Sequence, residues 1–519
     1  MKRHPVFTRI AGFALIAAFV LSGCSASRLA PSAPAAESYA APAALEAPAA
    51  APYYPDAPAD MFFEDYGVRG FVTAAKDNLS TFAVDVDTGS YTVARNYVQD
   101  GWLPPEDAVR AEEFVNYFDY QYPNPAADET FGIHVAGAPS PFADRQANRM
   151  VRIGIQGYSV PADQRQDVAL TFVIDVSGSM DMENRLGLAK RALYLLVNEL
   201  RATDSVAIVV YGSSARVALD RTPVSEKPVI LNAINQVYAE GSTNAAAGLW
   251  LGYRLASEHF NPEATNRVIL LSDGVANVGA TGPDEILDVI KRHAAEGITL
   301  TTVGLGMGNY NDTLMEQLAD KGDGFYAYVD SMQEAERLFV DELTSTLLTI
   351  AKDAKIQVEF NPEVVERYRL VGYENRDVAD DDFRNDEVDA GEIGAGHSVT
   401  ALYEIELLPG SEDADALIAT VRMRWAEMGT GEVIELDQPF TVGELAAGFE
   451  ASDPRFQLSV AVAEYAELLK HSPYAWEGSL ADLSAEVERI DGAITGQEGE
   501  ADEDVAELAQ LVWLAGSLD

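Results

Sequence analysis

The middle of the chain alternates between short aliphatic runs and longer amphipathic segments. The aliphatic runs predict strands at 168–176, 205–212, 266–274, 298–306 and 325–330. Apolar residues at helical spacing predict helices between and after them, at 184–202, 226–238, 245–260, 284–297, 311–320 and 332–346. Buried strands that alternate with helices indicate a mainly parallel sheet covered on both faces. The pattern therefore predicts a doubly wound, Rossmann-like α/β domain over residues 166–349.

Strand-like segments lie on both sides of this domain. Residues 61–165 mix short helices and strands, which makes an α+β region, and residues 350–519 are β-rich at first and helical from about 457. The termini of doubly wound domains often lie close together, which makes such domains easy to insert into another fold. The strands of the two flanks can then pair into one β-sandwich that the α/β domain interrupts. Flanks with separate cores would contradict this expectation.

The amino terminus predicts export and a lipid anchor. Basic residues precede an apolar run over 10–21 that is too short to span a bilayer, and the run ends in Leu-Ser-Gly-Cys at 21–24. This ending resembles a bacterial lipobox, which implies that Cys24 is lipidated. Ser25 after the cysteine favours, by the same resemblance, the outer membrane over the inner one in a Gram-negative cell. We expect a protein of the cell envelope, anchored to the membrane by its acyl chains.

Five regions follow from these patterns. Residues 24–60 are dominated by Ala, Pro and Ser, a composition typical of an extended tether that buries no core. The predicted regions are a lipoprotein signal peptide (1–23), the tether (24–60), an amino-terminal region (61–165), the α/β domain (166–349) and a carboxyl-terminal region (350–519).

The net charge limits the possible partners of the chain, and the cysteine content limits what can stabilise its fold. The chain has 36 Lys and Arg against 83 Asp and Glu, a formal net charge of -47 at pH 7. Such a chain repels a phosphate backbone, so we expect no nucleic-acid partner. Cys24 is the single cysteine, so disulfides cannot stabilise the exported fold. Stability must come from burial.

Three loops of the central domain carry oxygen-bearing side chains next to predicted strand ends. These residues are Asp175, Ser177, Ser179, Thr243 and Asp273. Ligands of an open parallel sheet bind outside the carboxyl ends of its strands. Hydroxyls and carboxylates without His or Cys suit a hard cation, so the set predicts a site for Mg²⁺, with Ca²⁺ or Mn²⁺ as alternatives.

The same segments carry a family resemblance. DVSGSM at 175–180, GSTN at 241–244 and LSDG at 271–274 resemble the metal-ion-dependent adhesion site of von Willebrand factor type A (vWA) domains. The segment 85–118 and the stretch after 351 resemble the flanks of bacterial vWA lipoproteins. The resemblance implies that Ser177, Ser179 and sometimes Thr243 bind the metal directly. It also implies that Asp175 and Asp273 act largely through water.

This site chemistry predicts a binding function. A metal held mainly by hydroxyls keeps much of its charge and leaves a position for one more anionic oxygen. We expect a carboxylate from an unidentified envelope or extracellular protein in that position. Because the chain is itself acidic, we expect basic residues around the partner's acidic anchor. The chain is then a lipoprotein that binds a partner through its metal, and no enzyme.

Two motifs point elsewhere and are given less weight. Asp87-Thr-Gly-Ser90 spells an aspartic-protease motif, but no second copy supplies the partner carboxylate that such an enzyme needs. The glycines of GLGMG at 304–308 follow a strand as in a nucleotide loop, but the third glycine is missing at the proper spacing. The alternative function is an envelope hydrolase, or an accessory subunit, in which the vWA domain recruits the substrate. The flanks show no recognisable catalytic set for it.

Overall fold

The computed structural model describes residues 61–126, 128–142, 148–161, 163–274, 283–307, 310–386, 388, 390–411, 413–428 and 430–518. All of them belong to one unit, residues 56–519. The predicted signal peptide, the tether and Cys24 lie outside the described residues. No helix in the described part of the chain is long and apolar enough to cross a membrane.

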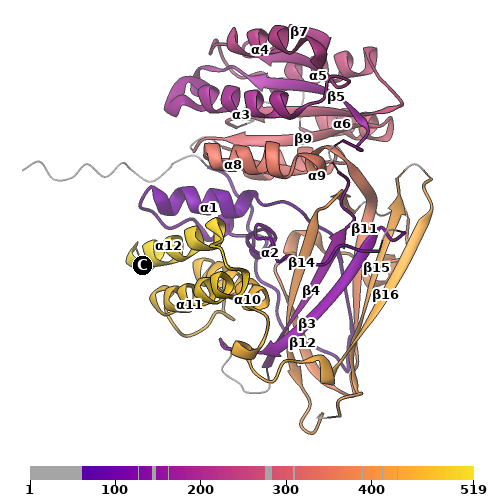
Figure 1. Cartoon of the computed structure of the whole chain (residues 1–519), viewed down its shortest axis with the longest axis vertical. Coiled ribbons are helices and arrows are strands. Elements are labelled where there is room, and N and C mark those ends of the chain that lie inside the picture. The colour runs from indigo at the N-terminus through magenta and orange to yellow at the C-terminus, as the bar shows by residue number, and fades with distance from the viewer. Residues whose placement is uncertain are drawn as a thin grey trace, which may run out of the picture. The chain divides into compact units, whose positions relative to one another are not determined.

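The central domain, at the top of Figure 1, contains a six-stranded sheet. The strand order in this sheet is β10-β9-β8-β5-β6-β7. Five strands are parallel and the edge strand β7 runs antiparallel to β6. The strands are β5 (Asp167–Asp175), β6 (Ser205–Tyr211), β7 (Ala215–Pro223), β8 (Ala264–Ser272), β9 (Ile298–Leu305) and β10 (Tyr326–Val329). Nearly all side chains of β5, β6, β8 and β9 are buried, as strands covered on both faces require. The doubly wound α/β fold is confirmed.

Helices cover both faces of this sheet. One apolar core joins it to α3 (Arg185–Glu199), α4 (Lys227–Asn235) and α8 (Met332–Glu336). Another joins it to α5 (Ala245–Glu258), α6 (Pro283–Ala295) and α7 (Asp312–Asp320). Two details differ from the sequence prediction. Strand β7 was missed because its exposed edge lacks an aliphatic run, and the predicted helix at 332–346 is divided by a π-helical turn at Arg337–Asp341 into α8 and α9 (Leu343–Leu347).

The two flanks form one β-sandwich, as expected. One sheet has the order β1-β12-β14-β4-β3 and the other β13-β11-β15-β16, with β2 also paired to β11. The strands before the central domain are β1 (Val72–Thr73), β2 (Leu79–Ala83), β3 (Phe131–Pro139) and β4 (Asn148–Gly157). Those after it are β11 (Thr349–Phe360), β12 (Val365–Val371), β13 (Gly391–Gly394), β14 (Ser398–Leu407), β15 (Leu417–Glu427) and β16 (Val433–Thr441). Each sheet therefore mixes strands from both flanks, and one shared apolar core lies between the sheets.

Five helices share a fourth core beside the sandwich (Figure 1). They also come from both flanks: α1 (Gly89–Gln99) and α2 (Ala111–Asn116) precede the central domain, and α10 (Pro454–Leu469), α11 (Leu480–Glu498) and α12 (Glu503–Leu518) end the chain. Aromatic side chains of α1, α2 and the turn after α2 pack in this core, with the rings of Tyr91 and Tyr117 4.2 Å apart. Phe114, Tyr117 and Phe118 also belong to this core.

Arginines from the flanks, with side chains no more than 12% exposed, fix the central domain in place. Arg376, at the end of a short turn after β12, lies 2.9–3.2 Å from four carboxylates: Asp85, Asp87, Glu316 and Asp320. The last two belong to α7 of the central domain.

Two further arginines make the same kind of joint. Arg110 pairs with Asp312 of α7 at 2.6 Å. Arg95 of α1 pairs with Asp330 and Glu334 of the central domain at 2.7 and 2.9 Å. We expect the domain to hold one orientation, because breaking any of these ion pairs would leave a buried charge without its partner.

Replacing Arg376 tests this joint. Arg376→Met leaves the nearly buried carboxylates of Asp85 and Asp87 without their counter-charge, so we expect the free energy of unfolding to fall by about 3 kcal/mol or more. Arg384→Met is the control: Arg384 pairs with Glu435 at 2.6 Å, but its side chain is 61% exposed, so we expect a loss below about 1 kcal/mol. Urea denaturation measures both. Equal losses in the two variants would contradict the structural role of Arg376.

Candidate metal centre

The first predicted loop curls around a buried carboxylate. Asp175 is the last residue of the central strand β5 and is fully buried. Its Oδ1 accepts a hydrogen bond of 2.8 Å from the backbone N–H of Ser177. The hydroxyl oxygens of Ser177 and Ser179 lie 3.0 Å apart. The two serines therefore point to one place, beside the carboxyl end of β5.

The second loop meets the first through backbone hydrogen bonds. Gly178 N–H donates to Gly241 O at 3.1 Å, and Glu240 N–H donates to Val176 O at 2.5 Å. Thr243 follows two residues later and is half-buried. Its neighbour Asn244 caps α5 by accepting a hydrogen bond from Ala247 N–H at 3.1 Å. The contacts described for these loops bring the Thr243 segment to the serine loop, although they do not include the Thr243 hydroxyl itself.

The third loop is tied to the first through a residue that the sequence analysis missed. The Ser272 hydroxyl, at the end of β8, donates to Asp175 Oδ2 at 2.9 Å. Burial raises the pKa of Asp175 to about 6, opposed by the hydrogen bonds from Ser177 and Ser272 and increased by the charge of Asp273. Asp175 and Asp273 thus lie close enough for their charges to interact.

Arg185 was also missed, and it adds a positive charge to the site. Its Nη1 donates to Asp273 Oδ2 at 3.0 Å, with both side chains about 5% exposed or less. The sequence offered one weak signal, a basic residue at the end of a segment that otherwise carries acids. An ion pair between residues so far apart in the chain depends on how β5 and β8 pair, and that pairing is not visible in the local pattern.

The donor set fits a hard cation. Among the described residues, no three His, Cys, Asp or Glu side chains gather closely enough to hold a metal ion. The oxygens that could hold a metal here are the hydroxyls of Ser177 and Ser179 and the two carboxylates, with the Thr243 hydroxyl on the adjoining loop. Oxygen donors without nitrogen or sulfur suit Mg²⁺, Mn²⁺ or Ca²⁺. Both carboxylates are buried, so a bound cation would balance part of their negative charge.

Packing explains the two motifs that pointed elsewhere. A Cβ at Gly304 would lie 1.9 Å from the Tyr310 hydroxyl, and a Cβ at Gly306 would lie 2.2 Å from Arg185 Nε. These glycines of the GLGMG segment are thus needed for close approach. Asp87 of the protease-like motif is held by Arg376 and by the Tyr326 N–H, which donates to Asp87 Oδ1 at 2.8 Å. Its carboxylate has a structural role.

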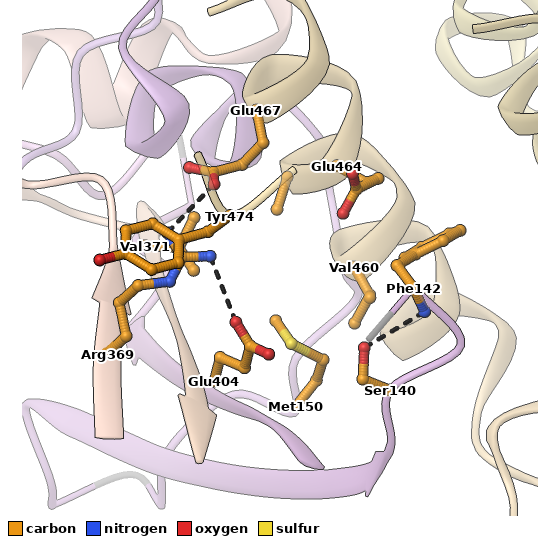
Figure 2. Close-up of a pocket in the computed structure, with 11 residues that line it drawn as sticks. Ser140, Phe142, Met150, Arg369, Val371, Glu404, Val460, Glu464, Glu467 and Tyr474 are labelled. Carbon is orange, nitrogen blue, oxygen red and sulfur yellow. Dashed lines mark hydrogen bonds and ion pairs between the residues drawn. The ribbon is translucent and has the colours of Figure 1, made fainter. Parts of the chain in front are cut away.

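A small cavity lies elsewhere, between α10 and the sandwich (Figure 2). Arg369 of β12 lies there between Glu467 and Glu404, at 3.0 and 3.4 Å, with the ring of Tyr474 against its guanidinium. The cavity measures about 20 Å³, which is room for about one water molecule. Burial raises the pKa of the nearby Glu464 to about 8, against the effect of the hydrogen bond it accepts from Trp476 N–H at 2.7 Å.

Three family descriptions match successive parts of the chain. "von Willebrand factor" matches residues 57–152, "von Willebrand factor type A domain" matches 169–341, and "Uncharacterized protein YfbK, C-terminal" matches 345–518. Von Willebrand factor type A domains are in general interaction modules, and they commonly bind divalent metals.

Relatives match over most of the chain. YfbK of Escherichia coli (strain K12) is 38% identical over 435 residues, which cover 79% of this chain and 74% of that protein. Protein sll0103 of Synechocystis is 25% identical over 315 residues, 59% of this chain and 71% of the other. A solved von Willebrand factor type A structure from Catenulispora acidiphila is 17% identical, covers 77% of this chain and 88% of its own, and has a TM-score of 0.40.

The raised pKa of Glu464 predicts a pH-dependent stability. The folded state holds a proton on Glu464 between its ordinary pKa and about 8, so stability should fall as pH rises through that range and level off above it. Glu464→Gln removes this contribution and keeps an oxygen that can accept from Trp476. As the pH rises toward 8, we expect the free energy of unfolding of this variant to increase relative to that of the wild type. The increase should be at most about 1.4 kcal/mol per pH unit. Urea denaturation at pH 5–9 measures this, and Glu500→Gln at an exposed position should parallel the wild type.

Proposed function

Since this chain belongs to the YfbK family of bacterial von Willebrand factor type A proteins, we propose that it binds a partner protein through a divalent metal ion. The loops after β5 and β8 and before α5 hold the ion. The observation that carries the proposal is the contact of these three loops: Ser177 and Ser272 both donate to Asp175, and Gly178 donates to Gly241. Three segments that resemble an adhesion site thus meet at one edge of the sheet.

Each predicted residue has a role in this proposal. The hydroxyls of Ser177, Ser179 and Thr243 are direct ligands, and Asp175 and Asp273 act mainly through water, as the family resemblance implies. When bound, the ion supplies a positive centre for one additional anionic oxygen. Asp175 also holds the serine loop closed through the Ser177 N–H. The chain's own part is therefore to position oxygens, and we propose no catalytic activity.

The partner that fits this site presents a carboxylate. A carboxylate oxygen gives the ion a charged ligand and a directional bond, which makes binding both strong and selective. Mg²⁺ is the first choice of metal, with Mn²⁺ or Ca²⁺ as alternatives. The net charge of -47 opposes an acidic partner at long range, so basic residues should surround the partner's anchor.

Metal uptake by the purified protein is the direct test. We expect titration calorimetry with Mn²⁺ to show one bound ion per chain and no binding to Asp175→Ala or Ser177→Ala, because both changes remove part of the donor set. Asp181→Ala is the matched control: Asp181 lies in the same segment but is exposed, so uptake should be unchanged. Absence of Mn²⁺, Mg²⁺ and Ca²⁺ uptake by the folded wild type would contradict the proposal.

The same variants test the partner. A pull-down from envelope extract should recover a protein that is lost both with EDTA and with Asp175→Ala, since each removes the ion that the partner's carboxylate binds. Asp181→Ala should recover it. A partner retained by Asp175→Ala in the presence of EDTA would bind elsewhere and would count against the metal as the binding element.

We further propose that Cys24 carries the lipid and holds the protein at the membrane, in the outer membrane if the cell is Gram-negative. Cys24→Ser removes the thiol that receives the acyl chains. We expect the full-length variant to leave the membrane fraction, because the described helices offer no span to replace the lipid. Cell fractionation with immunoblotting measures this, with Ser25→Ala as the control that should stay membrane-bound. A variant that remains in the membrane fraction after Cys24→Ser would argue against lipidation.

A further inference from the structure

The surrounding fold holds the side chain of Arg185 in one position. It is the first residue of α3, and its side chain is 5% exposed. One end of the guanidinium donates to Asp273 Oδ2 and the other to the backbone carbonyl of Met307. Gly306 has a φ of 75° and leaves the space in which Arg185 Nε lies. A larger residue at 306 would both strain the backbone and displace the guanidinium.

The guanidinium of Arg185 is a permanent positive charge beside Asp273, a candidate metal ligand. Asp175 and Asp273 are buried, at 0% and 4% exposure, and Arg185 adds one positive charge beside Asp273. A dication that shares the site gives the ion, the two carboxylates and Arg185 a net charge of about +1. Without Arg185 the sum is zero. Because both carboxylates and Arg185 are buried, solvent and salt screen the interactions among them only weakly.

We propose that Arg185 weakens metal binding at this site and strengthens the binding of the partner's carboxylate to the bound metal. It stays on Asp273 when the ion binds, holds that carboxylate's charge away from the ion, and so leaves the ion with positive charge for a carboxylate of the partner. The inference rests on the proposed metal-dependent function. Arg185 is a positioning residue, since it acts through Asp273 and not as a ligand.

The cost of this arrangement is weaker metal binding, and that can be measured without any partner. In Arg185→Gln the repulsion between the guanidinium and the dication is absent and Asp273 is fully available. We expect the full chain to bind Mn²⁺ at least about tenfold more tightly, measured by titration calorimetry. Arg185→Lys keeps the positive charge, so its Kd should lie within about threefold of the wild type.

Affinity for an anion should move in the opposite direction. With the Mn²⁺-loaded protein, acetate serves as the simplest carboxylate, and its binding is followed through the water proton relaxation rate. We expect Arg185→Gln to bind acetate at least about tenfold more weakly than the wild type. If Arg185 only supported the fold, Arg185→Gln would weaken both Mn²⁺ binding and acetate binding. It would then not strengthen Mn²⁺ binding.

The outcomes separate this inference from the proposed function. If the wild type binds no Mn²⁺, the proposed function fails and the role of Arg185 fails with it. If the wild type binds Mn²⁺ but folded Arg185→Gln binds it equally or more weakly, the inference alone is overturned. Should Arg185→Gln not fold, a crystal structure of the wild type with Mn²⁺ decides: Arg185 still hydrogen-bonded to Asp273 supports the inference, and Arg185 displaced from Asp273 overturns it.

Discussion

The pairing of β4 with β14 is the constraint on which the rest of this fold depends. The strands run antiparallel from Asn148 opposite Glu406 to Gln156 opposite Ser398, so a strand before the α/β domain pairs with one after it. The pairing of β2 with β11 does the same in the second sheet. Neither flank can bury its apolar face alone, because the core between the sheets takes residues from both. Folding of the sandwich therefore holds both ends of the α/β domain at one place.

Electrostatics then fix the orientation of that domain. Arg95, Arg110 and Arg376 come from the flanks and pair with acidic residues on the domain. The segment just before β1 adds a further link: Phe62 N–H donates to Tyr310 O in the domain, and Arg69 donates to Tyr373 O in the sandwich. In a chain with few basic residues, several arginines thus serve buried joints. A buried arginine among carboxylates contributes little when intact, but its loss leaves the acids uncompensated, so such joints favour a unique orientation.

The sequence predicted those features that depend on local pattern. Aliphatic runs marked β5, β6, β8, β9 and β10 because strands buried on both faces need apolar side chains throughout. The residue types in three loops predicted which segments meet at the end of β5. By contrast, β7 escaped notice because an exposed edge strand has no such run. The roles of Ser272 and Arg185 were missed because their contacts with Asp175 and Asp273 arise from the side-by-side packing of β5, β8 and α3.

A strongly acidic protein that binds a carboxylate needs a local charge opposed to its overall charge. At physiological salt, charges on the surface act over about 8 Å, so most of the net charge is screened from an approaching anchor. The buried groups at the end of β5 are not screened in this way, and there Arg185 lies on Asp273. A bound dication would make this a positive point on a protein whose net charge is strongly negative. In our proposal, a preference of the site for anions would follow from burial, because the same carboxylates on the exposed surface could not set the local charge so sharply.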